Sequence, residues 1–434
     1  MTAASHRGGS LDIYLQPARV GGGLGDIEEV LAVGRRLSRR GFRARLYRSG
    51  GRPLPPSVEG LWGWPPVQRM RRITHAAPRA LTVTSWWGVS ARPEGEIRGR
   101  AGPWSRETAE IEDAYGRDRV MHLSLEEFAR NLTSREQTRE RLREGGIASR
   151  SISRRLARRE TAREVRTFHE EYRRWRALDR PNVLHLFTAF RPSPAFGREF
   201  PEAIQTGPLW SDSVSARPGP RAQRCWIWYA SPSSSDRLAA EMARAIPRPS
   251  DRRGPLEVEV RGPRSLVLPP SPGIRWRTVA PTRPAAWHRR FRRAELRIVT
   301  GSRTLLEALG LGHPFLYFNG VLNRGSRTRR HRPEKIASLL EVWGRNGVSP
   351  ELRRDLADFS RLRRVPEILR KARGDPRWAD RFPARSASTG FVPPWDDAGT
   401  LIDRWVRDWS VSESSAEEFV ARCRREARSV RSRL

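Results

Sequence analysis

Short apolar runs and amphipathic stretches alternate from the start of the chain. Residues 11–15 form a largely apolar run and residues 42–47 alternate between apolar and polar positions, so both predict strands. Between them lie apolar positions that share one face of a helix ending before Gly41: Ile27, Val30, Leu31, Gly34 and Leu37. A strand, a helix and a second strand in this order predict a βαβ unit and therefore a parallel sheet.

The alternation continues and then restarts near the middle of the chain. In the first half the pattern predicts strands at 81–89, 119–123 and 183–187 and a helix at 133–178. In the second half it predicts strands at 225–229, 256–260, 266–268, 275–279, 296–299 and 315–318. The helices predicted there are 236–246, 305–309, 335–342, 398–409 and 416–433.

Two successive α/β halves follow from this pattern. Residues 211–220 have the Ser-, Pro- and Gly-rich composition of a linker between them. We therefore expect a first domain over residues 1–207, a linker over 208–222, a second domain over 223–395 and a helical tail over 396–434. The length of 434 residues suits two or three domains.

The chain is strongly basic, with 83 Lys and Arg against 48 Asp and Glu and a net charge of +35. Such a balance first indicates nucleic acid or an anionic membrane as a partner. Only Lys335 and Lys371 are lysines, however, and so complete a preference for arginine is typical of a GC-rich coding bias. We therefore attribute the net charge mainly to this bias in composition and not to a binding function. Nucleic acid is disfavoured as a partner. Residues 150–176, with ten arginines against four glutamates, keep two interpretations: a solvated helix, or a peripheral contact with an anionic membrane.

The two cysteines, Cys225 and Cys423, exclude a disulfide framework and a cysteine-based zinc site. The N-terminus lacks the apolar segment of a signal peptide, and no stretch approaches the roughly 18 apolar residues of a membrane span. These features predict a cytoplasmic protein, peripheral at the inner membrane face if the basic helix binds lipid. No histidine or cysteine cluster has metal-ligand spacing, so we expect no metal and no cofactor.

A glycine-rich segment follows the first predicted strand. Gly22, Gly23 and Gly25 let a ligand approach the backbone N–H groups at the start of the next helix. Asp26 has two open interpretations. It is either a general base at the bottom of a cleft between two domains or a helix N-cap that forms a capping box with Glu29.

A second such junction lies between the strands predicted at 296–299 and 315–318. Gly301, Ser302 and Thr304 come directly before and within the start of a helix, where Ser302 can cap the helix and free N–H groups can bind a phosphate. Glu307 follows on the same helix. Its carboxylate is either a hydrogen-bond acceptor for vicinal sugar hydroxyls or an ordinary solvated helix residue.

Two polar loops are further candidates for anion binding. Ser233, Ser234 and Ser235 lie between a predicted strand and a predicted helix, and either surround a diphosphate or form a plain loop. Arg327 and Arg330 belong to the segment RGSRTRRHR at 324–332, which either clamps phosphates or is a solvated basic loop.

Three of these segments together resemble the GT-B glycosyltransferase superfamily, including its MurG-like and glycogen synthase-like members. The glycine-rich loop ending in Gly25-Asp26 resembles the first loop of the acceptor domain. The segment PEAIQTGPL at 201–209 resembles the entry to the donor domain. The segment at 294–318, with GSRTLLEALGLGHP inside it, resembles the donor motif and is the most specific of the three.

The resemblance implies two Rossmann-like α/β domains that face each other across a cleft, with C-terminal helices crossing back. It implies that Glu307 binds the nucleotide ribose and that Gly301, Ser302 and Thr304 lie near the donor phosphates, beside Ser233–Ser235. Asp26 falls where MurG-like enzymes keep a histidine base. Trp86 and Trp87 form the aromatic end of the strand predicted at 81–89 and are expected on the acceptor side.

The expected function is therefore metal-independent transfer of a sugar by a hexosyltransferase-type enzyme. The donor is a nucleotide-diphosphate sugar such as a UDP-sugar, and the acceptor hydroxyl belongs to a glycan, a lipid or a small molecule. The alternatives are a GT-B-fold sugar epimerase, a catalytically silent nucleotide-sugar-binding protein, and an arginine-rich nucleic-acid-binding protein.

Overall fold

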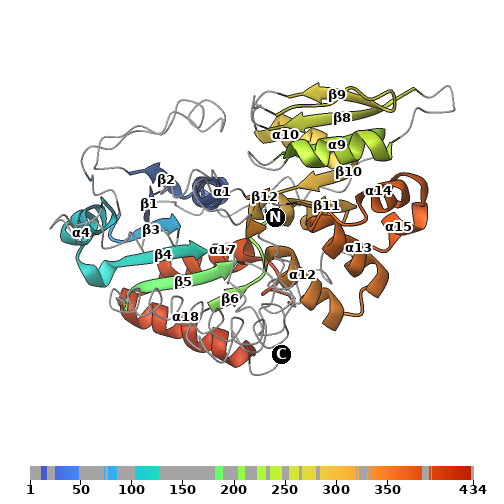
Figure 1. The fold of residues 1–434 in the computed structure, drawn as a ribbon. Helices are drawn as coiled ribbons and strands as arrows, with labels where there is room; N and C mark the ends of the chain where they lie inside the picture. The colour runs from blue at the N-terminus through green and yellow to red at the C-terminus, as the bar shows by residue number, and fades with distance from the viewer. Residues whose placement is uncertain are drawn as a thin grey trace, which may run out of the picture.

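A computed structural model shows two α/β blocks, each built around a parallel sheet (Figure 1). The structure describes residues 11–16, 25–47, 73, 77–85, 103–126, 181–188, 204–210, 222–230, 235–246, 254–262, 266–279, 284–318, 320–321, 330–331, 334–383, 391 and 393–431. The helix predicted at 133–178, and with it residues 150–176, lies outside these ranges.

The first sheet has six parallel strands in the order β2-β1-β3-β4-β5-β6. Their bounds are β1 Asp12–Gln16, β2 Arg43–Leu46, β3 Ala80–Ser85, β4 Val120–Glu126, β5 Val183–Thr188 and β6 Ile204–Thr206. The helices described between them are α1 Gly25–Arg39, α4 Pro103–Tyr115 and the short 3₁₀ helix η1 Arg117–Arg119. The parallel sheet predicted from the βαβ pattern is thus confirmed.

Helix α1 ends and packs as its glycines dictate. Gly41 has a φ of 90°, its N–H donates to the Ser38 carbonyl, and the Phe42 N–H donates to the Leu37 carbonyl. These two bonds define a Schellman motif, in which a glycine takes the left-handed position after the helix. At Gly34 a Cβ would lie 2.3 Å from a methyl carbon of Leu15, so the missing side chain lets α1 approach β1 closely.

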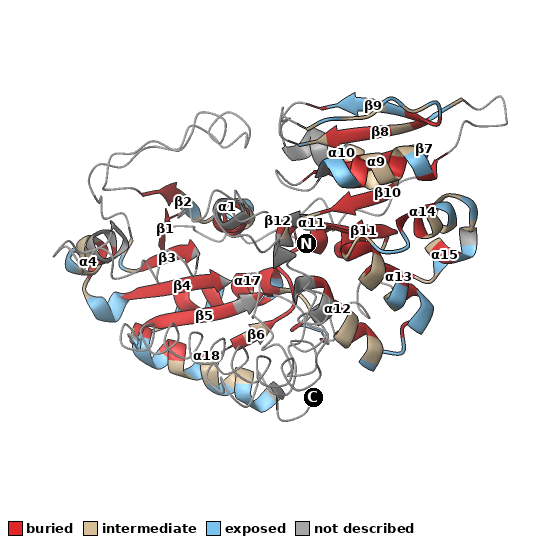
Figure 2. Ribbon diagram, viewed as in Figure 1, coloured by how far each residue is buried: buried red, intermediate tan, exposed pale blue. Residues whose placement is uncertain are grey.

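The two faces of the first sheet differ in polarity because side chains alternate along each strand. One face is apolar and packs against α1 and the C-terminal helices, with Ile13, Leu15, Leu81, Val83 and Leu123 in a single core. The other face is polar although it is buried (Figure 2). On it the Tyr115 hydroxyl donates to Asp12 at 2.7 Å, and the Thr82 hydroxyl lies 2.6 Å from His122 Nδ1.

The second sheet has five parallel strands in the order β11-β10-β7-β8-β9. Their bounds are β7 Ala222–Tyr229, β8 Leu256–Arg261, β9 Ile274–Thr278, β10 Ala294–Val299 and β11 Phe315–Tyr317. A short antiparallel pair, β12 Gly320–Val321 and β13 Arg330–His331, follows. The helices of this block are α9 Ser235–Ala245, α10 Pro284–Arg293, α11 Ser302–Gly310, α12 Glu334–Arg345, α13 Pro350–Ser360, α14 Val365–Gly374 and α15 Pro376–Asp380.

The chain crosses between the two blocks twice, and the two crossing segments bind each other. The Gly207 N–H donates to the Trp395 carbonyl at 2.6 Å, and the Ala398 N–H donates to the Pro208 carbonyl at 3.2 Å. Leu209 packs in the core of the first block, whereas Trp210 packs in the core of the second. The outgoing segment therefore changes core between these two neighbouring residues.

The returning segment leads into two helices that belong to the first block. Helices α17 (Ala398–Ser410) and α18 (Ala416–Arg431) lie against the apolar face of the first sheet, drawn red in Figure 1. Trp405, Trp409 and Phe419 share one core with β1, β3 and β4. Two Rossmann-like α/β domains whose C-terminal helices cross back are thus observed, and the predicted fold class is confirmed.

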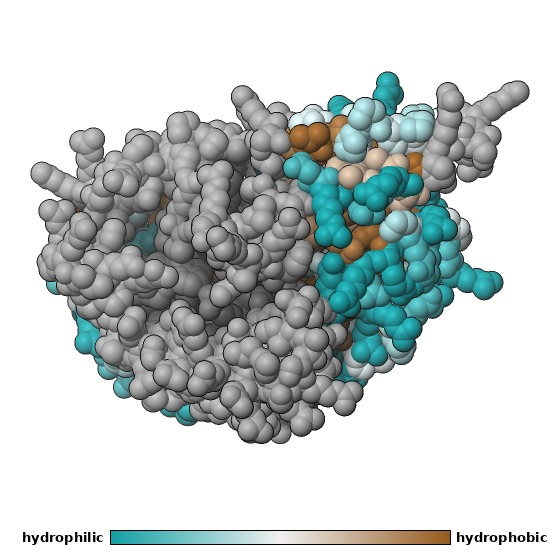
Figure 3. Space-filling view, in the orientation of Figure 1, coloured by the Kyte–Doolittle hydropathy of each residue, from teal (hydrophilic) through white to brown (hydrophobic). Residues whose placement is uncertain are grey.

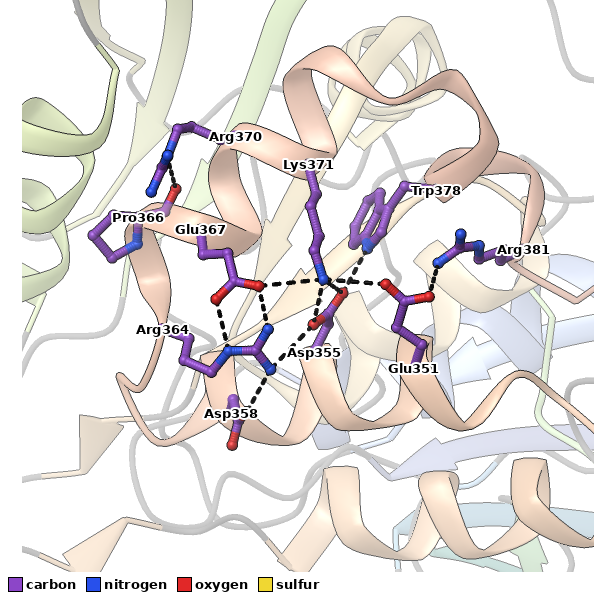
Figure 4. Close-up of polar contacts among 10 residues, drawn as sticks. All are labelled: Glu351, Asp355, Asp358, Arg364, Pro366, Glu367, Arg370, Lys371, Trp378 and Arg381. Carbon is purple, nitrogen blue, oxygen red and sulfur yellow. Dashed lines mark hydrogen bonds and ion pairs between the residues drawn. The ribbon is translucent and has the colours of Figure 1, made fainter.

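An ion-pair network joins α13, α14 and α15 (Figure 4). Lys371 Nζ lies 3.3 Å from the buried Asp355 carboxylate and 3.2 Å from Glu351. Arg364 and the Trp378 indole N–H reach the same Asp355. The compact ammonium of Lys371 lies between three carboxylates, those of Glu351, Asp355 and Glu367. The planar fork of an arginine has a different geometry. The described surface over these helices is mainly hydrophilic (Figure 3).

The structure differs from the sequence-based expectations at several elements. The strand predicted at 266–268 is wrong: Val267 is 65% exposed, its N–H donates to the Asp236 carboxylate, and two prolines follow. Strand β6 was not predicted, because its three residues before Gly207 are too few to show an alternating pattern. Helices α4, α10, α13, α14 and α15 were not predicted either.

We predict that Gly207→Ala destabilises the protein because a Cβ there would lie 2.2 Å from the Asp396 carbonyl oxygen. This overlap is with backbone, so relief requires the two crossing segments to separate, at a cost of about 1–3 kcal/mol. Urea unfolding measures the loss. Gly374→Ala is the matched control, since a Cβ there meets nothing within 4 Å. Equal stabilities of the two variants would contradict the tight crossing.

Candidate functional site

The strand order of the second sheet creates a switch point at its carboxyl edge. The chain runs outward from β7 through β8 to β9 and then returns to β10 on the other side of β7. In open parallel sheets, ligands bind at such a switch point, beyond the carboxyl ends of the strands. The helices that follow the two flanking strands are α9 and α11, so both helix N-termini lie at this edge. Their N–H groups make it suited to an anion.

The start of α11 is organised by Gly301 and Thr304. Gly301 is the N-cap, with an extended backbone, and its N–H donates to the Thr304 hydroxyl at 3.2 Å. The Thr304 hydroxyl in turn donates to the Gly301 carbonyl. The expectation that Ser302 caps this helix is therefore corrected: Ser302 is its first residue.

Glu307 lies one turn further along α11 and is buried, with 5% of its surface exposed. The Arg303 guanidinium lies 3.7 Å from its carboxylate, four residues earlier on the helix. Arg303 is itself buried and donates to the Leu209 carbonyl at 2.9 Å. The interpretation of Glu307 as a solvated helix residue is thus wrong, and Glu307 is anchored beside the crossing between the domains.

The electrostatic setting of Glu307 combines burial with positive charge. Burial raises the pKa of Glu307 to about 7, while the positive charges of Arg303, Arg261 and Arg35 oppose that rise. Arg35 belongs to α1 of the first domain and Arg261 to β8 of the second. Arginines of both domains therefore act on Glu307, and the pKa of its carboxyl depends on where these arginines lie.

Arg261 is a residue of this site that the sequence-based analysis missed. It ends β8 at the carboxyl edge, and its guanidinium donates to the Tyr229 hydroxyl at the end of β7 at 2.7 Å. Its carbonyl accepts the N–H of Ala230, directly before the Ser-rich segment. The available signal was an arginine directly after the apolar alternation at 256–260.

The first sheet has its own switch point, between β1 and β3. The order β2-β1-β3 places the second strand on one side of the first and the third on the other. The glycine-rich segment follows β1 along the chain, and Trp86 follows β3. Helix α1 begins at Gly25, so Asp26 is its second residue and not the N-cap that the sequence suggested. The buried Glu29 accepts a hydrogen bond from the Thr188 hydroxyl at 2.7 Å.

The structure brings together three of the predicted donor residues. Gly301, Thr304 and Glu307 lie on or next to α11. For Asp26, Ser235, Ser302 and Arg330 the backbone is described, as the second residue of α1, the first residues of α9 and α11, and part of β13. Five predicted residues and one range lie outside the described part: Gly22, Gly23, Trp86, Trp87, Arg327 and 233–234.

Two features of the described residues bear on metal binding and membrane insertion. No group of three or more His, Cys, Asp or Glu side chains among them is placed to hold a metal ion. Among the same residues, no helix has the length and apolar character needed to cross a membrane.

Comparison with known proteins finds similarity among solved structures. No protein-family model and no curated protein matches the sequence. The chain is similar to CalG4, the calicheamicin glycosyltransferase (15% identity over 92% of this chain and 98% of that one, TM-score 0.44). It is similar to WaaG, a glycosyltransferase involved in lipopolysaccharide biosynthesis (12%, 95% and 98%, TM-score 0.38). It is also similar to an α-glucosyltransferase in complex with UDP (10%, 92% and 99%, TM-score 0.40). CalG4 and WaaG are named as glycosyltransferases and the third protein as a glucosyltransferase.

We predict that Glu307 makes stability depend on pH. The pKa of Glu307 is 4.5 in the unfolded chain and about 7 in the folded protein. The contribution of this group to the free energy of unfolding is therefore fully present below pH 4.5 and is lost as pH rises through about 7. Relative to Glu307→Gln, the wild type should lose on the order of 3 kcal/mol of unfolding free energy across this window. Denaturant unfolding at several pH values measures it.

The exposed Glu413 provides the control, because Glu413→Gln changes the same charge in solvent. The difference between wild type and that variant should stay flat over the same pH range. A flat difference for Glu307→Gln as well would contradict a buried carboxyl at position 307.

Proposed function

We propose that this protein transfers a sugar from a nucleotide-diphosphate donor to an acceptor hydroxyl, with the donor on the second domain and the acceptor on the first. The observation that carries the proposal is the switch point of the second sheet, where the N-termini of α9 and α11 lie at the same carboxyl edge and Glu307 lies further along α11. An anion-binding edge next to a buried carboxylate suits a ligand that joins a diphosphate to a ribose.

The diphosphate is held by backbone N–H groups and by arginine. The first turns of α9 and α11 place backbone N–H groups at the carboxyl edge of the sheet, and Arg261 adds a guanidinium at the end of the neighbouring strand. Negative charge develops on the diphosphate as it leaves the sugar, and fixed donors stabilise that charge without reorganisation. In this proposal these groups neutralise the leaving diphosphate, and the transfer is metal-independent.

Glu307 binds the ribose. An ionised carboxylate accepts hydrogen bonds from two vicinal hydroxyls, and Arg303 keeps the Glu307 side chain oriented from four residues away. Because the pKa of Glu307 is about 7 without ligand, donor affinity should fall as pH drops below 7 and the carboxyl becomes protonated.

The acceptor approaches over the glycine-rich segment and Trp86-Trp87, and Asp26 removes the proton from its hydroxyl. Asp26 lies in the first turn of α1, the helix that follows the first strand at the switch point of the first sheet. A carboxylate near a helix N-terminus is stabilised as an anion, which keeps it ready to accept a proton. Cys225 and Cys423 are free thiols, which suits the reducing environment of the cytoplasm.

Glu307→Ala should raise the dissociation constant of the donor nucleotide at least tenfold, because the ribose hydroxyls lose their acceptor. Thermal shift against UDP, GDP, ADP and dTDP sugars first identifies the nucleotide, since a ligand that binds the native state raises the melting temperature. Calorimetry on the wild type and the variant then measures the constant. Glu413→Ala, an exposed glutamate of the first domain, is the control.

Unchanged affinity in Glu307→Ala would contradict the ribose assignment. Product analysis with a labelled nucleotide sugar separates transfer from epimerisation. Steeply salt-dependent binding of DNA, with no response to any nucleotide sugar, would overturn the proposal in favour of a nucleic-acid-binding protein.

A further inference from the structure

A row of polar side chains runs across the first sheet at its switch point. Gln16, the last residue of β1, pairs with Thr84 of β3, which pairs with Ser124 of β4, which pairs with His185 of β5. Strands paired in register direct matched side chains to the same face. We call these four residues the polar row. Gln16 and Thr84 belong to the two strands that flank the switch point.

The polar row continues the polar face of the sheet. Side chains two residues earlier on the strands lie on this face: Tyr14 contacts the Tyr115 hydroxyl at 2.7 Å, and Thr82 contacts His122 at 2.6 Å. The next residues along the strands, towards their carboxyl ends, are the members of the row. The apolar core under α1 and α17 lies on the opposite face, so the row is separate from that packing.

All four members of the row are buried, yet two of them have polar atoms without a hydrogen-bond partner among the described residues. Gln16 is 4% exposed and Ser124 is 1% exposed. Neither the oxygen nor the nitrogen of the Gln16 amide, nor the Ser124 hydroxyl, has a hydrogen-bond partner in the described part of the chain. The deeper polar groups of the same face, by contrast, bond to one another. A buried polar group without a partner costs stability, so its presence points to a role outside the fold.

The chemistry of the row indicates what it binds. An amide and hydroxyls both donate and accept hydrogen bonds, as do the hydroxyls of a sugar. Burial, aided by the charge of Arg424, lowers the pKa of His185 well below its ordinary value, so the imidazole is neutral. The row thus presents uncharged groups only, which suit a neutral polyol better than a phosphate or an apolar ring.

We infer that the polar row binds the hydroxyl groups of a carbohydrate, so that the acceptor is a saccharide or carries one. Gln16 and Ser124 act as specificity-determining residues at the end of the acceptor nearest the sheet. This inference rests on the proposed function for its meaning, because it names the acceptor class of the same transferase. The binding itself can be measured without any donor.

The test uses Gln16→Met in the full chain, with Ser124→Ala as a second variant. Methionine keeps the length of glutamine and removes both unsatisfied polar atoms, so the melting temperature should rise by about 2–4 °C. Saturation-transfer NMR with methyl β-D-glucoside and with maltose should show binding to the wild type and at least a fivefold weaker signal for Gln16→Met. Binding of the planar phenol 4-methylumbelliferone should be weak in both proteins.

Thr82→Val is the matched control, since Thr82 lies on the same face but has His122 as its partner. It should lower the melting temperature and leave saccharide binding intact. Gln16→Met with a lowered melting temperature, or with unchanged saccharide signals, would overturn the inference, as would a wild type that binds only the phenol.

Nucleotide binding measured on the same proteins keeps the two proposals apart. If the wild type binds no nucleotide sugar, the proposed function fails, and the saccharide signals still judge the row. If nucleotide binding is intact in every variant and the saccharide signals do not respond to Gln16→Met, the inference about the row alone fails.

Discussion

The mutual binding of the two chain segments that cross between the domains is the constraint on which the rest of the structure depends. The Gly207 N–H bonds the Trp395 carbonyl, and the Trp210 indole bonds the Asp396 carbonyl, at a separation that leaves no room for a side chain at position 207. Each segment also holds one helix of the proposed site. Arg303 ties α11 to the Leu209 carbonyl of the outgoing segment. Arg36 ties α1 to Asp397 of the returning segment and to Asp403 of α17.

This arrangement gives several arginines a local role that the net charge of the chain conceals. Arg297 is fully buried and donates to the carbonyls of Phe291 and Arg292, so it closes the end of α10 over β10. Arg303 and Arg36 hold the crossing, and Arg261 stands at the edge proposed for the diphosphate. The guanidinium group suits these places because its fixed fork of donors reaches several oxygens at once. A compositional bias toward arginine and a structural use of arginine are therefore compatible.

The elements that could be predicted from the sequence are those marked by helical periodicity or by apolar runs. Residues 225–229 of β7 read as an unbroken apolar run, and α1 with its Gly41 end could be located from spacing alone. Glu307 was identified from a motif. Arg303 lies four residues before Glu307, and this i,i+4 spacing was enough to predict their ion pair. Strand β6 was too short to show alternation, while none of the described strands pairs with the apolar residues at 266–268.

The polar face of the first sheet lay beyond what the sequence could predict, because its buried Gln16, Thr82 and His122 read as exposed positions of half-buried strands. Only the strand register shows that they form rows, and only the hydrogen bonds of the folded protein show that Thr82 and His122 bind each other whereas the Gln16 amide has no partner among the described residues. In the same way, Arg261 gains its meaning from the strand order, which places the end of β8 beside the switch point.

We propose that a nucleotide-diphosphate sugar binds at the switch point of the second sheet. Hydrogen–deuterium exchange of the full chain, with and without the nucleotide sugar that most raises its melting temperature, locates the bound ligand. We predict slower amide exchange in residues 235–240 and 301–307, the first turns of α9 and α11. Protection confined to other segments, with exchange in both of these turns unchanged, would contradict it.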